Sequence, residues 1–420
     1  MRRYSYYGYG RRRSLGRWLI YGAIALVLLL PLAEFGAGRW LAARQPDRQT
    51  TVSLQQAYRL RWQDGGDPTG EGLAVQAHPL LGYELLPQRS DRWRIDRQGF
   101  RLAADLSETK PADEIRIFVL GNSTAFGSLA ANNEGAVGAQ LETLLQERLQ
   151  SQKTQPTRFK PVYLPFYADQ IEAMAALPPR IREGKYRVIP AGVPGYASGN
   201  ELALLVHRVL DFAPDAVILL DGYEDLRLPE TQAAAAPPAK ASIAPGLAYR
   251  QHLQAQFQSW WQSWHLVQWL RGDWQAAAHV ETTFAGDRFA ATPTALAARV
   301  QRYHRNLKQT ARVLRGVPTL VALQPEITGK SKLAPSEQAM RQRLDPLYPA
   351  RAIAGYEALN RRQGDFGHLR FSNLHRLFDN TAEAMFVDPI HLTAAGNRRL
   401  AERLYSLLEP VLATTPLPNP

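Results

Sequence analysis

Short apolar runs alternate with amphipathic stretches through most of the chain beyond residue 110. Four runs have the length and composition of strands, at residues 115–120, 186–189, 215–220 and 318–323. Stretches of helical length lie between and after these runs, at residues 134–149, 200–210, 294–314 and 393–408. Apolar strands that alternate with helices are typical of a parallel sheet covered by helices on both sides. The pattern therefore predicts an α/β domain over residues 111–412.

The N-terminus carries a different pattern, an uncharged apolar run over residues 18–33. Six arginines precede this run, at Arg2, Arg3, Arg11, Arg12, Arg13 and Arg17. A helix that spans a bilayer needs about 20 residues, which the run approaches if its helix continues to residue 36. Arginines on one side of such a helix favour a cytoplasmic N-terminus. We predict a basic cytoplasmic tail at residues 1–17, one transmembrane helix at 18–36 and an extracytoplasmic remainder.

A cleaved signal peptide is the competing interpretation of this N-terminus. Small residues follow the apolar run at positions 36–38, as they do at signal cleavage sites. We favour an uncleaved membrane anchor, because the run is longer than the usual core of a signal peptide. The predicted location is the membrane, crossed once.

Two segments stand outside the alternation of strands and helices. Residues 37–110 contain a glycine-rich loop signal at 65–70 and are predicted to be a membrane-proximal connector that packs beside the main domain. Residues 228–292 are predicted to be a helical insertion, which opens with an alanine- and proline-rich linker and continues with a tryptophan-rich helix. This helix fits three roles: packing on the domain, capping the active site, or lying at the membrane interface, where tryptophan is favoured.

Composition narrows the classes of function. The chain has 420 residues, 45% of them hydrophobic, and no cysteine, which excludes disulfides, thiolate nucleophiles and cysteine metal sites. A formal net charge of +12 raises the question of nucleic acid, but the basic residues are spread along the chain apart from the N-terminal cluster. The histidines show no metal-binding spacing. We expect no nucleic-acid partner, no metal and no cofactor.

Two short motifs carry candidate chemistry. Ser123 directly follows the first predicted strand, at the edge where open α/β sheets place their sites. Asp388 and His391 lie together just before the last predicted helix. Two intervening residues let one loop present both side chains, so that Asp388 orients the imidazole and the other ring nitrogen faces a serine. Each motif alone is common in structural turns, and only their order along the domain makes them specific.

That order resembles the SGNH (GDSL-type) serine hydrolase superfamily over residues 112–410. Its sequence blocks correspond here to Gly121-Asn122-Ser123, Gly195, residues 222–225, and Asp388 to His391. The resemblance implies a three-layer, flavodoxin-like α/β/α fold with a parallel sheet of about five strands. It also implies hydrolysis of acyl esters without a metal, by Ser123, His391 and Asp388. The oxyanion would be bound by the N–H groups of Ser123 and Gly195 and by a side chain of the third block.

The sequence departs from this family at two positions. Asn122 stands where many members have aspartate, and that position is tolerant. Glu224 stands where the family has an asparagine that donates to the oxyanion, and a carboxylate cannot donate unless it is protonated. Loss of one such donor typically costs ~10²–10³ in rate. Glu224 is therefore a doubtful member of the oxyanion hole.

Three hypotheses for the function follow from these residues. The first is an ester hydrolase that removes acyl groups, such as acetyl, from cell-envelope polysaccharide. The second is an acyltransferase on the same fold, in which a sugar hydroxyl replaces water as the acceptor. The third is a non-catalytic, membrane-tethered binding or assembly factor, which Glu224 favours and the intact Ser–His–Asp set opposes. Gln324, which follows the fourth predicted strand, could line the site, but we favour its interpretation as part of a turn.

Overall fold

The computed structural model describes residues 21, 29–37, 39–40, 60–62, 72–228, 288–361 and 366–418. The chain forms two compact units, one of residues 1–53 and 240–280 and one of residues 54–239 and 281–420. In the first unit, the described residues 29–37 and 39–40 are helical. The second unit contains the sheet and every candidate site residue.

Most of the predicted membrane span and most of the predicted insertion lie outside the described residues. Within the described ranges, no helix is both long enough and apolar enough to cross a bilayer. The span at 18–36 and the tryptophan-rich helix within 228–292 therefore stay predictions, as do the domain boundaries.

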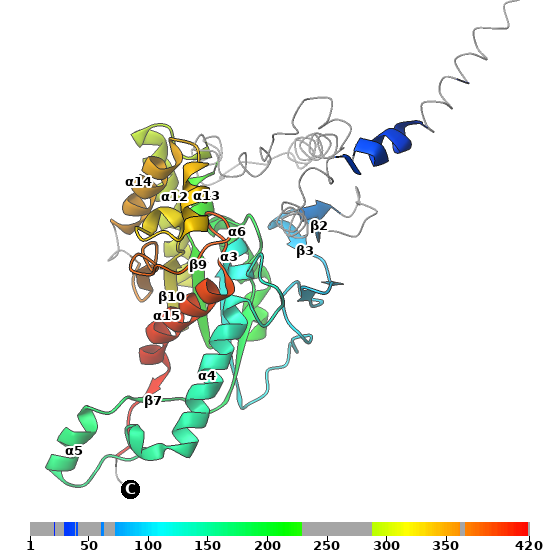
Figure 1. The fold of residues 1–420 in the computed structure, drawn as a ribbon. Coiled ribbons are helices and arrows are strands. Elements are labelled where there is room, and N and C mark those ends of the chain that lie inside the picture. Colours follow the sequence, from blue (N-terminus) through cyan, green and yellow to red (C-terminus); the bar gives the residue numbers. More distant parts are fainter. Residues whose placement is uncertain are drawn as a thin grey trace, which may run out of the picture. The chain divides into compact units, whose positions relative to one another are not determined.

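The second unit is built on a five-stranded parallel sheet in the order β11-β10-β9-β6-β8 (Figure 1). Its strands, in chain order, are β6 (Glu114–Gly121), β8 (Lys185–Pro190), β9 (Ala216–Asp221), β10 (Thr319–Leu323) and β11 (Arg370–Asn373). The chain moves from β6 to β8 on one side and then returns to β9 on the other. This reversal makes the carboxyl end of β6 the topological switch point, where α/β sheets place their sites.

The parallel α/β sheet expected from the sequence is confirmed. Four of its strands coincide with the predicted apolar runs, and all residues of β6, β9 and β10 are buried. The fifth strand, β11, has no apolar run, because its four residues are exposed or half-buried. The hydrophobic pattern of the sequence therefore does not reveal this strand.

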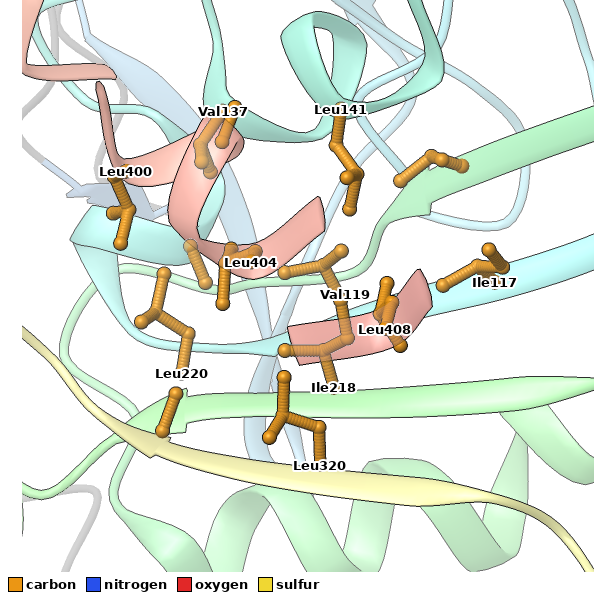
Figure 2. Close-up of a cluster of buried hydrophobic side chains, with 14 of the residues drawn as sticks. Ile117, Val119, Val137, Leu141, Ile218, Leu220, Leu320, Leu400, Leu404 and Leu408 are labelled. Atoms are coloured by element: carbon orange, nitrogen blue, oxygen red, sulfur yellow. The ribbon is translucent and has the colours of Figure 1, made fainter. Parts of the chain in front are cut away.

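Two long helices cover one face of the sheet, α4 (Val137–Thr154) and α15 (Ala394–Leu412). Figure 2 shows their apolar side chains meeting alternate residues of the strands. The labelled members of this core are Ile117, Val119, Val137, Leu141, Ile218, Leu220, Leu320, Leu400, Leu404 and Leu408. Burying one such side chain completely contributes about 1.5–3 kcal/mol, so this layer holds the helices firmly against the strands.

The opposite face of the sheet is covered by a second helical layer. Its helices are α6 (Ser198–His207), α12 (Pro293–Val313) and α14 (Tyr348–Asn360), and α12 packs against both of the others. Phe118 of β6 points to this side, where its ring lies 5.6 Å from that of Phe100 and 6.3 Å from that of Phe212. Alternate residues of β6 thus face the two helical layers. The sheet is covered on both sides, as predicted.

Shorter elements complete the unit. Before the sheet lie β1 (Leu60–Trp62), β2 (Leu73–His78), β3 (Gly82–Leu85), β4 (Gln88–Arg89) and β5 (Arg94–Ile95). Within and after the sheet lie α3 (Ser123–Phe126), η2 (Pro156–Arg158), α5 (Ala168–Ala175), β7 (Arg180–Ile181), η3 (Val209–Phe212), α7 (Tyr223–Leu226), η7 (Ile327–Gly329), α13 (Pro335–Gln342) and β12 (Ala413–Thr414). The antiparallel hairpin of β2 and β3 belongs to the same compact unit as the sheet.

Candidate active site

Ser123 is the first residue of the short helix α3, directly beyond the end of β6. Gly121 ends the strand with a φ of +147°, and a Cβ atom there would lie 2.1 Å from the carbonyl oxygen of Leu220 in β9. Only glycine allows the two strands to approach this closely at their carboxyl ends. Asn122 then caps the helix, because its Oδ1 accepts a hydrogen bond from the N–H of Thr124 at 3.0 Å. These two residues fix the position of Ser123, which is only 7% exposed.

Asp388 and His391 meet in the loop before α15, as the sequence predicts. Oδ2 of Asp388 lies 2.6 Å from Nδ1 of His391. The other carboxylate oxygen accepts the N–H groups of Ile390 at 3.1 Å and of His391 at 2.8 Å. The aspartate thus orders the loop and orients the imidazole that the loop carries.

The contact with His391 also affects the protonation of the Asp388 carboxyl group. Burial by itself raises the pKa of Asp388, but the charge and hydrogen bond of His391 and the two backbone N–H groups lower that pKa below its ordinary value. Asp388 is therefore a carboxylate at neutral pH, able to accept the Nδ1 proton of the imidazole. In the part of the chain that the structure describes, the buried Nε2 of His391 has no hydrogen-bond partner. This nitrogen is the atom that would act as the base.

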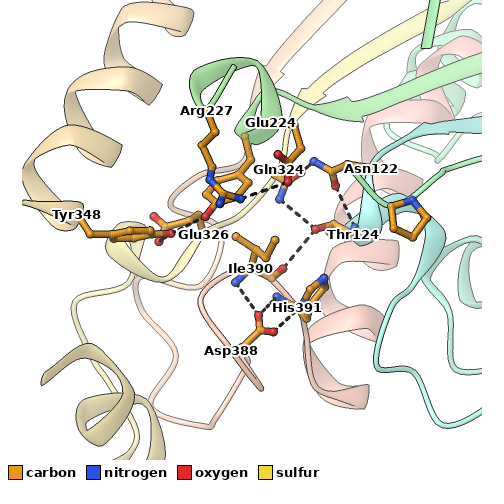
Figure 3. A network of polar contacts seen from close by, with 12 residues as sticks. Asn122, Thr124, Glu224, Arg227, Gln324, Glu326, Tyr348, Asp388, Ile390 and His391 are labelled. Carbon is orange, nitrogen blue, oxygen red and sulfur yellow. Dashed lines mark hydrogen bonds and ion pairs between the residues drawn. The ribbon is translucent and has the colours of Figure 1, made fainter. Parts of the chain in front are cut away.

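A chain of side-chain contacts joins the serine loop to the histidine loop (Figure 3). Nδ2 of Asn122 donates to Oε1 of Gln324 at 2.7 Å, and Nε2 of Gln324 donates to Oγ1 of Thr124 at 3.0 Å. The hydroxyl of Thr124 donates in turn to the carbonyl oxygen of Ile390 at 3.3 Å. Ile390 directly precedes His391, so this network ties the two loops together.

The network accounts for two residues at which the sequence was uninformative. Gln324 is fully buried and bridges the first block to Thr124, rather than merely forming a turn after β10. Asn122 both accepts from a backbone N–H and donates to Gln324, and an aspartate could only accept. An amide therefore suits this position better than an aspartate would. Only contacts between distant segments reveal either role.

Gly195, in the segment after β8, has a backbone N–H group that is a candidate donor to an oxyanion. Gly195 has a φ of +83°, a conformation that favours glycine. Among the described residues, neither the N–H of Gly195 nor that of Ser123 has a hydrogen-bond partner. Both of these N–H groups therefore remain able to donate to an oxyanion.

The third block follows β9 and forms the short helix α7. Asp225 is buried there and accepts hydrogen bonds from the N–H of Ser198 at 2.9 Å and from its hydroxyl at 2.5 Å, so it holds the start of α6. Glu224 is partly exposed and forms an ion pair with Arg227, with 3.5 Å between Oε1 and Nη1. A carboxylate paired with a guanidinium accepts hydrogen bonds but does not donate them.

The described residues contain no group of three or more histidine, aspartate and glutamate side chains that could hold a metal ion. Ser123 lies just after β6, at the start of α3, and Gly195 lies in the segment after β8. Asp388 and His391 lie in the loop before α15.

Comparison with known proteins finds likenesses only among solved structures. No protein family and no curated protein matches the chain. A protein of the G-D-S-L lipolytic family from Desulfitobacterium hafniense is 9% identical with a TM-score of 0.32, over 70% of this chain and 99% of that one. An acetyl xylan esterase is 15% identical with a TM-score of 0.31, over 70% and 100%. A lipase/acylhydrolase from Enterococcus faecalis is 12% identical with a TM-score of 0.32, over 72% and 98%. All three likenesses are distant.

Proposed function

We propose that the chain is a serine ester hydrolase with Ser123 as nucleophile, His391 as base and Asp388 as the residue that orients the base. The observation that carries this proposal is the 2.6 Å contact between Asp388 and His391, together with the buried Nε2 of His391, which lacks a partner among the described residues. A catalytic histidine of this kind holds its aspartate through Nδ1 and keeps Nε2 for the hydroxyl of its nucleophile.

The proposed reaction follows from these positions. Nε2 of His391 takes the proton of the Ser123 hydroxyl as Oγ attacks the acyl carbonyl carbon. The carbonyl oxygen becomes an oxyanion, which the N–H groups of Ser123 and Gly195 stabilise. The imidazolium, held by the Asp388 carboxylate, gives its proton to the departing alcohol. Water then attacks the acyl-serine with His391 again as base, releasing the acid and the free serine.

The finer assignments are part of the same proposal. We infer an extracytoplasmic location from the arginine-rich N-terminus and its apolar run, and an acyl ester, such as the acetyl ester of a cell-envelope polysaccharide, as the substrate class. An acyltransferase would use the same residues with a sugar hydroxyl in place of water. The ion pair of Glu224 with Arg227 supports a second candidate, a binding or assembly factor, since it leaves the oxyanion hole one side-chain donor short.

A fluorophosphonate probe tests the proposed function directly. We expect the purified chain to be labelled at Ser123 and to hydrolyse simple aryl esters, and we expect Ser123→Ala and His391→Ala each to abolish turnover. The two residues act as one unit, so the double variant should be no slower than either single variant. Thr143→Ala is a matched control, because it removes an exposed hydroxyl on α4 that bonds only its own helix. Wild-type turnover in both single variants would rule out the hydrolase and favour the binding factor.

A further inference from the structure

The hairpin of β2 and β3 touches the peptide that carries the proposed oxyanion donor. The hydroxyl of Tyr83, in β3, donates a hydrogen bond to the carbonyl oxygen of Pro194, 111 residues away along the chain. The Tyr83 ring also packs edge-on against that of Tyr196, with 5.3 Å between the ring centroids. Tyr83, from a distant segment, therefore packs against the residues on both sides of Gly195.

The geometry of one peptide unit makes this contact relevant to chemistry. The carbonyl of Pro194 and the N–H of Gly195 belong to the same peptide bond, which is trans. In a trans peptide the two groups point in opposite directions. A hydrogen bond to the carbonyl fixes the plane of the peptide and polarises it, which strengthens the N–H as a donor on the other side.

The same contact explains why residue 195 is glycine. A Cβ atom at this position would lie 2.7 Å from the hydroxyl oxygen of Tyr83, which is too close for a side chain. The tyrosine and the glycine therefore fit each other. Burial raises the pKa of Tyr83 well above its ordinary value, and the neighbouring Tyr196 and Glu224 raise it further. The hydroxyl consequently keeps its proton and remains a donor at neutral pH.

Further contacts hold the hairpin in this place. The hydroxyl of Tyr196 donates to the backbone carbonyl of Tyr83. Nδ2 of Asn200, in α6, donates to the carbonyl oxygen of Leu81 at 2.9 Å. Arg208 pairs with Glu84 at 2.5 Å. The tyrosine is thus presented by a segment that is bound at several points, not by a loose connector.

We infer that Tyr83 is a positioning residue of the oxyanion hole: its hydroxyl holds the Pro194–Gly195 peptide with the Gly195 N–H directed at the developing oxyanion. The inference rests on the proposed function and extends it, because it makes the segment before the sheet a working part of the site. Tyr83 touches no reacting atom and acts only through the peptide.

Tyr83→Phe tests this role, since it removes the hydroxyl and keeps the ring. We expect kcat on an aryl ester to fall about tenfold, less than the ~10²–10³ for loss of a complete oxyanion donor. KM should stay within about twofold, because the lost interaction matters only when the oxyanion forms. Affinity for a boronic acid that forms a tetrahedral adduct with Ser123 should fall by the same factor as kcat.

Tyr196→Phe is the matched control, because it removes a hydroxyl from the same interface without touching the Pro194 carbonyl. Its turnover should fall clearly less than that of Tyr83→Phe. Equal losses in the two variants would mean that Tyr83 only docks the hairpin, and an unchanged kcat in Tyr83→Phe would overturn the inference as well.

A measurement independent of turnover separates this inference from the proposed function. In protein labelled with ¹⁵N-glycine, the amide resonance of Gly195 should shift in Tyr83→Phe and stay in place in Tyr196→Phe. An unshifted Gly195 amide in Tyr83→Phe would overturn the inference even in an active enzyme. A wild-type chain that neither labels nor hydrolyses esters would instead overturn the proposed function, whatever the Gly195 amide shows.

Discussion

At the scale of single residues, Glu224 is the position where the site departs most from its expected chemistry. Its carboxylate pairs with Arg227 and so can accept but not donate. Replacing it by an asparagine supplies a side-chain donor without changing Ser123, His391 or Asp388. We therefore predict that Glu224→Asn raises kcat on aryl esters by up to ~10²-fold.

A second variant separates the gained donor from the lost charge. Glu224→Ala removes the same negative charge but adds no donor, so it should leave kcat near its wild-type value. If Glu224→Asn turns over no faster than wild type, residue 224 is not an oxyanion donor position, and the idea of a slow enzyme should be dropped.

At the scale of elements, three buried carboxyl groups meet where β9, α6 and α7 join. They belong to Glu201, Asp221 and Asp225, each about 1% exposed. Burial and, to a smaller extent, the charges of neighbouring carboxyls raise the pKa of all three groups, to about 7 for Asp221 and about 6 for Asp225. The hydroxyl of Tyr303 donates to Asp221, and Arg302 acts in the opposite sense by lowering the pKa of Asp225.

The sign of the resulting pH dependence follows from linkage. In the unfolded chain these groups lose their protons near pH 4, whereas in the folded chain they keep them toward pH 7. The folded state therefore binds more protons between these values, and the free energy of unfolding should fall as pH rises from about 4 to about 7. Glu201→Gln removes one carboxyl and should make this fall shallower. Urea unfolding of both proteins at pH 5 and pH 8 measures it, and an equal loss of stability in the two proteins would contradict the prediction.

At the scale of the whole molecule, the location of the sheet unit is a prediction from the N-terminal sequence. The six N-terminal arginines and the apolar run at 18–33 predict a cytoplasmic N-terminus and an extracytoplasmic remainder. A reporter that is active only outside the cytoplasm, fused after the last residue, should be active. Replacing Arg11, Arg12 and Arg13 by glutamine should weaken that signal. A stable but silent fusion to the wild-type chain would contradict the predicted topology.

The sequence by itself predicted four of the five strands of the sheet and named the candidate site residues. Apolar runs such as 215–220 record burial directly, because a strand covered on both faces has no place for polar side chains. The site motifs are also visible in the sequence, because each occupies only a few consecutive residues. Their order along the chain is Ser123, Gly195, and Asp388 to His391. The contact between Asp388 and His391 follows from a separation of three residues within one loop.

The tertiary structure alone decided which distant segments support those residues. The edge strand β11 has no apolar run, because its four residues are exposed or half-buried. Gln324 reads as a turn residue until its amide is seen to join Asn122 to Thr124. Tyr83 lies in a segment that reads as a connector, yet it reaches the peptide before Gly195. Hydrophobic pattern records how deeply a residue is buried, but a hydrogen bond between residues a hundred or more positions apart depends on how the whole chain folds.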